Sequence, residues 1–336
     1  MKRIIRSDWR VVVPVVLLCV CAGCPQYRDA SVPNQILTME EPLSGEEYLV
    51  YVPSVYDPSH AHPLVVLCHG TEPFDTPRRQ MGDWVKLAEE KGFVAIAPHL
   101  KGTAARLVHN AREQIRRQRR DEQTILDVVR HARGAYNISD DRVFLVSWSA
   151  GSYASLFTGL RNPEVFRAVA VLQGNFDPAL FVDAVTRVDP HQPVLVLYGA
   201  EDVLTGREGR KCADWLEEHR VNVVRSKKGG GHQGHPKEAC TFFENVVRTV
   251  PWMHIRAFQT GDDPLTVQFK IRSSFEPAEY RWSFGDGETS PIAEPRHTYA
   301  GPGAYRVILD ARPPKGAVVR RTVEVKVGQG GMVNRE

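Results

Sequence analysis

The chain of 336 residues is 42% hydrophobic and 25% charged, with 26 glycines and 23 prolines. These proportions are those of a globular protein and exclude collagen-like, coiled-coil and wholly disordered chains. The 43 basic residues exceed the 40 acidic ones by only three, too small a bias to indicate a nucleic-acid partner. At roughly 100 to 200 residues per domain, the length predicts about two domains.

The first 24 residues have the pattern of an export signal. Basic residues precede an apolar stretch over 11–22, which is about half the roughly 20 residues that span a bilayer. The stretch ends in Cys21-Ala22-Gly23-Cys24, which resembles the lipobox of bacterial lipoproteins and implies lipidation of Cys24 and a membrane anchor. Ordinary signal cleavage and an uncleaved anchor are the alternatives, and all three place the mature chain outside the cytoplasm.

Three cysteines follow the signal: Cys68, Cys212 and Cys240. An odd number leaves at least one thiol unpaired. Cys68 lies in an apolar run and is expected to be a buried small hydrophobe. Cys212 and Cys240 are therefore the one pair that could form a disulfide in an oxidising compartment, with two free thiols as the alternative.

Between residues 45 and 250, short apolar runs alternate with longer stretches of helical periodicity. The apolar runs predict strands over residues 48–52, 64–68, 93–97, 143–146, 168–172, 194–197 and 222–225. The stretches between them predict helices over residues 84–90, 123–135, 150–160, 207–219 and 237–247. This alternation is typical of an α/β fold whose mostly parallel sheet is covered by helices on both faces.

After residue 250 the pattern changes to alternating residues separated by turns. It predicts strands over residues 265–271, 280–284, 304–309 and 318–327. Runs of period two predict a small all-β sandwich. The chain is therefore expected to divide into a signal at 1–24, a linker at 25–44, an α/β domain at 45–250, a β-sandwich at 251–328 and a tail at 329–336.

The strongest chemical signal lies at residues 143–151, where a strand, a turn around Ser149 and a helix follow in succession. Small residues two before and two after the serine, Ser147 and Gly151, allow a strained turn that lifts the hydroxyl above the sheet. Centring the motif on Ser147 or Ser152 gives less suitable flanks. Ser149 is therefore the candidate nucleophile, with a chance loop match as the alternative.

A serine hydroxyl needs an adjacent base that is held in orientation by a carboxylate. In this kind of fold the acid and the histidine follow the serine, on loops after later strands. Asp202 follows an apolar run, and His232 follows three glycines. They are preferred to Glu201 and His235 because a glycine stands three residues before the acid and directly before the histidine. A surface turn residue and a solvated or adventitious metal-binding histidine pair are the alternatives.

Stabilisation of an oxyanion needs two backbone N–H groups, each worth on the order of a hundredfold in rate. Ala150, directly after the nucleophile, is expected to supply one. The other is expected from His69-Gly70-Thr71, where the backbone can approach closely. Thr71 is the first choice and Gly70 the second. No cofactor and no metal site is predicted.

Together these motifs resemble the α/β-hydrolase superfamily. Within it, the segments over residues 48–53, 92–98 and 141–145 resemble the secreted polyhydroxybutyrate depolymerase and feruloyl or acetyl-xylan esterase group. The resemblance covers about residues 45 to 248. It implies an exported serine esterase that needs no cofactor and acts on polymeric or bulky esters, such as those of polysaccharides or polyesters.

The segment over residues 280–287, with 297–299 and 303–307, resembles a PKD domain. The resemblance covers about residues 254 to 328 and implies an immunoglobulin-like sandwich of the kind attached to extracellular enzymes and surface proteins. Trp282 and Tyr305 are expected in its core rather than on a ligand platform. Such a domain would aid polymer docking or act as a spacer.

The sequence therefore predicts an exported or membrane-anchored serine hydrolase that cleaves carboxylic esters through an acyl-enzyme. Ser149 would attack the carbonyl, His232 would take and return the proton, and Asp202 would orient His232. The alternatives are a peptidase of the same fold and a non-catalytic surface-binding protein with a degenerate hydrolase domain.

Overall fold

The computed structural model describes residues 35–103, 110–185, 188–259 and 263–328. The predicted export signal and the lipidation site at Cys24 lie outside these ranges. None of the helices within them combines the length and the apolar character that a membrane span requires.

The α/β part of the chain is built on one eight-stranded sheet with the order β1-β2-β4-β3-β5-β6-β7-β8. Strand β2 is antiparallel to both its neighbours, whereas β3 to β8 pair in parallel. The strands are β1 (Ile36–Glu40), β2 (Glu47–Tyr51), β3 (His62–Cys68), β4 (Val94–Pro98), β5 (Ile138–Trp148), β6 (Ala168–Leu172), β7 (Pro193–Gly199) and β8 (Asn222–Lys228). The fold is that of an α/β-hydrolase, as predicted.

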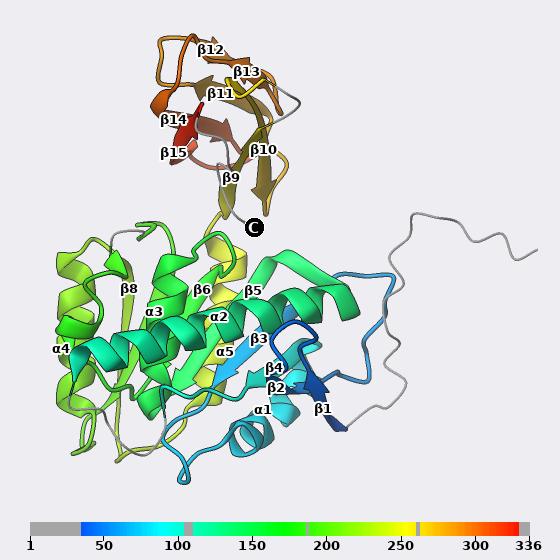
Figure 1. The fold of residues 1–336 in the computed structure, drawn as a ribbon. Coiled ribbons are helices and arrows are strands. Elements are labelled where there is room, and N and C mark those ends of the chain that lie inside the picture. The colour runs from blue at the N-terminus through cyan, green and yellow to red at the C-terminus, as the bar shows by residue number, and fades with distance from the viewer. Residues whose placement is uncertain (1–34, 104–109, 186–187, 260–262, 329–336) are drawn as a thin grey trace, which may run out of the picture.

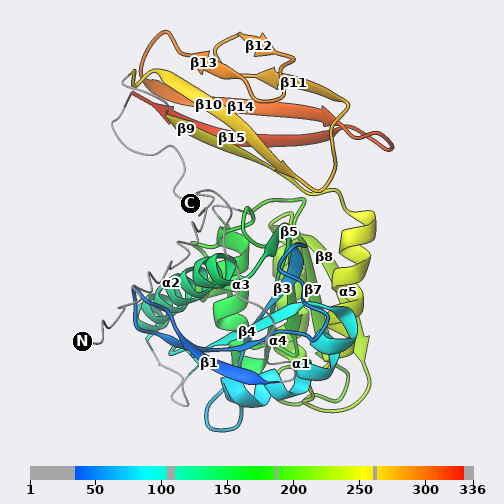
Figure 2. The same ribbon diagram turned by 90° about the vertical axis from the view of Figure 1, so that its right-hand side faces the viewer.

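Helices cover both faces of this sheet (Figure 1, Figure 2). One face is covered by α2 (Ala111–Ala135), α3 (Ser152–Arg161) and α4 (Gly206–Glu218), and the other by α1 (Pro77–Lys91) and α5 (Pro236–Thr249). Short 3-10 turns lie at Ser149–Gly151 (η1) and Pro178–Leu180 (η2). Because both faces are covered, neighbouring strand residues such as Leu145 and Phe144 are buried on opposite sides, which explains the continuous apolar runs in the sequence.

Two elements differ from the sequence prediction. Strand β1 lies within the segment predicted as a linker and pairs with β2 at the sheet edge. Its residues are half-buried or exposed, so it has no continuous apolar run to mark it. Helix α2 begins at Ala111, whereas the sequence predicted its start at residue 123. The prediction missed the first turns because the side chains they bury are polar, among them Gln114 and Gln118.

The possible disulfide between Cys212 and Cys240 is absent. All three cysteines in the described part of the chain are free and buried. Cys212 lies on α4 in the core of one face of the sheet, whereas Cys240 lies on α5 in the core of the other face. The sheet separates the two thiols, so a bond between them would require the fold to rearrange.

The C-terminal part forms two antiparallel sheets, ordered β13-β10-β9 and β12-β11-β14-β15. Their strands are β9 (Met253–Gln259), β10 (Thr266–Ser273), β11 (Glu279–Ser283), β12 (Thr289–Ser290), β13 (Arg296–Thr298), β14 (Gly303–Arg312) and β15 (Val319–Val327). Trp282 is fully buried in their shared core, as predicted. Tyr305 is only half-buried, and its ring stacks on Tyr299 at 4.0 Å between centroids.

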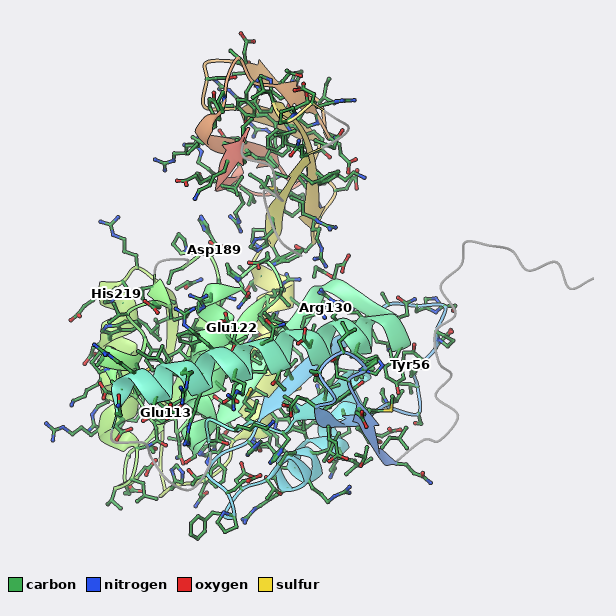
Figure 3. All side chains as sticks on the ribbon, in the orientation of Figure 1. Tyr56, Glu113, Glu122, Arg130, Asp189 and His219 are labelled. Carbon is green, nitrogen blue, oxygen red and sulfur yellow. The ribbon has the colours of Figure 1, made fainter. Side chains whose placement is uncertain are left out.

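The β-sandwich packs against one end of the hydrolase sheet (Figure 1). Arg272 of β10 forms an ion pair with Asp140, near the start of β5. His254 and Arg321 each lie 3.9 Å from the carboxylate of Asp189, which Figure 3 labels at the end of the hydrolase fold that faces the sandwich. These contacts lie at the amino ends of the parallel strands. The carboxyl ends of β3, β5, β6 and β7 therefore lie at the opposite edge, away from the sandwich.

Candidate active site

Ser149 lies at the sharp turn between β5 and α3. Its backbone is left-handed, with φ of 53°, a conformation that costs a residue with a side chain about 1–2 kcal/mol. The turn is held in part by Asn175, whose backbone N–H donates to the Ser149 carbonyl at 3.3 Å. A half-exposed serine in a strained strand-to-helix turn has the geometry of a nucleophile elbow.

Gly151 allows this turn to approach the neighbouring strand β3. A Cβ atom at Gly151 would lie 2.3 Å from the carbonyl oxygen of Cys68 and 2.7 Å from that of His69. Real Cβ atoms do not approach backbone oxygens so closely, so no larger residue fits unless the backbone moves. The close approach of the end of β3 to the turn therefore requires a small residue two positions after the serine.

Replacing Gly151 with alanine is expected to lower the free energy of unfolding by about 3 kcal/mol, because the atoms it meets are backbone atoms that cannot turn aside. Gly82→Ala, in the exposed middle of α1 with no atom within 4 Å, is the matched control and should be neutral or stabilising by about 1 kcal/mol. Urea unfolding measures both. Equal stability of the two variants would contradict the close approach.

Ser147 occupies the position where glycine is usual in the serine motif. It is fully buried, and its hydroxyl accepts a hydrogen bond of 2.6 Å from the Ser155 hydroxyl on α3. Because this bond satisfies the hydroxyl within the fold, serine is accommodated at this position without altering the turn. The same bond removes Ser147 from consideration as an exposed nucleophile.

The structure brings His232 and Asp202 together. Nδ1 of His232 lies 3.0 Å from Oδ2 of Asp202, whose side chain is completely buried. The imidazole also stacks on the indole of Trp148, with 5.0 Å between ring centroids, so it lies beside the residue that precedes Ser149. No hydrogen bond joins Ser149 to His232 in the described ranges. Such bonds are often long in ligand-free enzymes and tighten with substrate.

Asp202 is held by hydrogen bonds on both carboxylate oxygens. Oδ2 accepts from the Thr205 hydroxyl at 2.5 Å, and Oδ1 accepts from the backbone N–H groups of Leu204 and Thr205 at 2.9 and 3.0 Å. Burial by itself raises the pKa of Asp202, but the hydrogen bonds from Thr205 and His232 outweigh it, so the pKa lies below its ordinary value. The carboxylate is therefore ionised at neutral pH and keeps the proton of His232 on Nδ1.

The neighbouring acid and the second histidine have other partners. Glu201 accepts a hydrogen bond from the backbone N–H of Gly230, in the loop before His232. His235 lies 3.8 Å from Glu238, one turn further along. Of the two acid candidates, only Asp202 contacts His232.

Polar side chains hold the loop after β3 through the carbonyl and the N–H of Gly70. The backbone N–H of Leu100 donates to Nε2 of His69 at 3.0 Å, so the proton of this imidazole is on Nδ1, which donates to the Gly70 carbonyl at 3.0 Å. The Gly70 N–H is taken by Asp75 at 2.6 Å. The Thr71 N–H donates to no atom in the described part of the chain. This arrangement favours Thr71 over Gly70 as the free donor, and its role in an oxyanion hole stays a prediction.

Burial lowers the pKa of His69 to about 4, so the folded protein keeps this imidazole neutral where the unfolded chain binds a proton. The contribution of His69 to the free energy of unfolding is therefore expected to fall as the pH drops from about 6.5 toward 4, by about 2 kcal/mol at pH 5. His69→Asn keeps an N–H for the Gly70 carbonyl and should remove this contribution, leaving that of His254, whose pKa burial also lowers to about 4. Urea unfolding at pH 7.5 and 5 tests this; identical pH dependence in the two proteins would contradict it.

Two residues of the site carry no signal that the sequence analysis used. Thr205 contacts both Asp202 and Nδ1 of His232, the latter at 3.3 Å. Asp202 accepts the N–H of Leu204, two residues on, as in an Asx turn, and also that of Thr205, so this local pattern could have been recognised. Gln173 touches the loop around His232 from a position with no local motif.

Two family models match the chain. A prolyl oligopeptidase family model matches residues 81–202, and a PKD domain model matches residues 250–327. The PKD match covers the β-sandwich and confirms the predicted C-terminal domain. Collagenase ColQ1 of Bacillus cereus (strain Q1) is 34% identical over 74 residues, which are 21% of this chain and 8% of that protein.

Several solved structures are similar to the chain at low identity. A ferulic acid esterase from Anaeromyces mucronatus aligns with a TM-score of 0.49 and 15% identity, over 64% of this chain and 89% of its own. The fluorophosphonate-binding serine hydrolase FphF of Staphylococcus aureus gives 0.48 and 16%, over 64% and 97%. A dipeptidyl aminopeptidase IV homologue from Bacteroides ovatus gives 0.46 and 12%, and this chain spans 35% of its length.

Proposed function

Since the chain has a serine-hydrolase fold followed by a PKD domain, we propose that it hydrolyses carboxylic esters through Ser149, His232 and Asp202. One observation carries the proposal: an imidazole bonded through Nδ1 to a buried, ionised carboxylate stacks on Trp148, the residue before a serine in a left-handed turn. This is the arrangement that makes a serine hydroxyl nucleophilic.

In the proposed reaction the unprotonated Nε2 of His232 takes the hydroxyl proton as Ser149 attacks the ester carbonyl. The oxyanion is stabilised by the N–H groups of Ala150 and Thr71. His232 then gives the proton to the departing alcohol, which leaves an acyl-enzyme on Ser149. Water, deprotonated by the same imidazole, attacks the acyl group, and the acid is released as Ser149 recovers its proton.

Exposed apolar side chains support a substrate with an apolar part. Phe74 follows the loop of Thr71 and is 73% exposed, and Val203 and Leu204 follow Asp202 and are 94% and 66% exposed. Hydrogen bonds hold the backbone of both loops: the Phe74 carbonyl accepts from Arg79, and the Leu204 N–H donates to Asp202. Ordered apolar groups on loops beside a reacting serine favour a bulky ester over a small polar one.

A peptidase activity is the second candidate because the prolyl oligopeptidase family model matches residues 81–202. Recognition of a peptide amino terminus requires a free carboxylate near the serine. On the surrounding loops, Glu72 is paired with His99 and Glu201 with Gly230, and in the first turn of α4 Glu208 is paired with Asn175 and Phe176. These contacts favour the ester over the peptide.

Export with a lipid on Cys24 belongs to the same proposal. The pattern of the first 24 residues and the PKD match support it, since such domains occur on extracellular proteins. The collagenase likeness, although it covers 8% of that protein, is consistent with a polymeric substrate. Metabolic labelling with a palmitate analogue should mark the wild-type protein and leave Cys24→Ala unmarked; an unlabelled wild type would contradict lipidation.

A substrate panel tests the ester proposal. The panel compares p-nitrophenyl acetate and butyrate, aryl esters such as methyl ferulate, and an insoluble polyester with dipeptide p-nitroanilides at equal enzyme concentration. The proposal requires hydrolysis of at least one ester class, lost in Ser149→Ala. Hydrolysis of the anilides alone would establish the peptidase instead, and no Ser149-dependent turnover of any of them would favour a binding protein.

A further inference from the structure

Gln173 lies directly after β6, at the carboxyl edge of the sheet where Ser149 and Asp202 also lie. It is fully buried, and its φ of 46° is left-handed. Such a backbone favours glycine and costs other residues about 1–2 kcal/mol. A buried, strained glutamine at this edge therefore needs a role that glycine could not fill.

The Gln173 side chain contacts the backbone on both sides of His232. Its Nε2 donates to the Gly231 carbonyl at 2.9 Å, and its Oε1 accepts from the Gln233 N–H. The primary amide therefore uses one N–H donor and its carbonyl acceptor to bind the two residues that flank His232. These two bonds fix the backbone from which the His232 ring projects.

The backbone of Gln173 joins the remaining loops. Its N–H donates to the Leu197 carbonyl of β7 at 2.7 Å, and its carbonyl oxygen lies 2.8 Å from the Thr205 hydroxyl oxygen. Thr205 in turn contacts Asp202. One residue thus connects the acid loop and the histidine loop to the end of β6.

The histidine loop has little packing of its own to hold it. At Gly229 and Gly231 an added Cβ would meet nothing within 4 Å, so the loop runs through open space on these sides. At Gly199, by contrast, a Cβ would lie 2.7 Å from Nε2 of Gln173 and 2.7 Å from the Asp202 Cβ. The glycine that precedes Asp202 therefore makes room for the amide to reach the loop.

We propose that Gln173 is a positioning residue that holds the His232 imidazole between Ser149 and Asp202. The inference rests on the proposed function and adds to it the anchor of the base. A displacement of about 1 Å in a catalytic group can cost a hundredfold in rate. Loss of the two bonds should therefore lower kcat and leave substrate binding, and so KM, nearly unchanged.

The test compares Gln173→Leu, which keeps the side-chain volume and removes both bonds, with Gln192→Leu. Gln192 is a second buried glutamine that bridges to a backbone carbonyl, that of Phe166 at 2.6 Å, but it lies at the amino end of β7, away from the site. With p-nitrophenyl acetate we expect Gln173→Leu to lose about a hundredfold in kcat with KM within twofold, and Gln192→Leu to stay within twofold in both.

A second variant separates positioning from folding. Gln173→Gly removes the same two bonds while relaxing the left-handed backbone, so it should fold and still lose activity. The ring signals of His232 in ¹H–¹⁵N spectra give a readout that needs no turnover, and they should broaden or shift in both Gln173 variants but not in Gln192→Leu.

Two outcomes would overturn the inference: kcat of folded Gln173→Leu or Gln173→Gly within threefold of wild type, or unchanged His232 signals in both. A wild type that turns over no substrate would count against the proposed function alone, because the His232 spectra would still decide whether Gln173 fixes the ring.

Discussion

Ser149→Ala is expected to reduce hydrolysis of every ester substrate by about a millionfold in kcat, to the level left by binding and oxyanion contacts. The reason is that the two neighbouring serine hydroxyls are engaged elsewhere: Ser147 is buried against Ser155, and the Ser152 hydroxyl donates to the Asn175 carbonyl at 2.6 Å. Initial rates with p-nitrophenyl acetate, on protein of verified fold, measure the effect.

A companion variant separates the chemistry of Ser149 from its backbone strain. Ser149→Gly also removes the hydroxyl, but it relaxes the left-handed φ of 53°. It should therefore be equally inactive and about 1 kcal/mol more stable than Ser149→Ala. A residual activity of a few per cent in either variant would show that another group is the nucleophile.

Asp202→Asn should lower kcat by about ten-thousandfold. The amide cannot stabilise the imidazolium that forms when His232 takes the serine proton, and it allows the wrong tautomer of the ring. The hydrogen bonds from Thr205 and Leu204 to the native carboxylate hold it in place, so water is not expected to substitute for it.

Glu201→Gln is the matched control for this variant. It makes the same chemical change one residue earlier, on an exposed side chain that holds Gly230, and its amide oxygen can still accept that N–H. Its kcat should stay within about threefold of wild type. If the two variants lost activity equally, the assignment of the acid to Asp202 would be wrong.

Much of the hydrolase fold could be predicted because the strands of a sheet that is covered on both faces appear in the sequence as continuous apolar runs. The run over residues 168–172 is β6, residue for residue, and every one of its side chains is buried. Elements at the edge of the fold have no such apolar runs. Strand β1 is half-exposed, and the first turns of α2 bury polar residues such as Gln118, which donates to the Tyr153 carbonyl; neither forms an apolar run.

The residues of the candidate site likewise include some that the sequence could predict and some that it could not. Ser149 and Asp202 could be proposed because the first directly follows β5 and the second lies three residues after the end of β7, so the fold dictates which edge of the sheet each occupies. Gln173 also follows a strand, but a lone glutamine has no characteristic chemistry, and its contacts to Gly231 and Gln233 join segments about sixty residues apart. Such pairing is decided by loop paths that local patterns do not encode.

The most direct test of the account is the reaction of the folded protein with a fluorophosphonate, followed by peptide mass spectrometry. The account predicts a single adduct on Ser149, formed at a rate that falls at least a hundredfold in His232→Ala. Absence of an adduct, an adduct on Ser147 or Ser152, or labelling that is indifferent to His232 would contradict it.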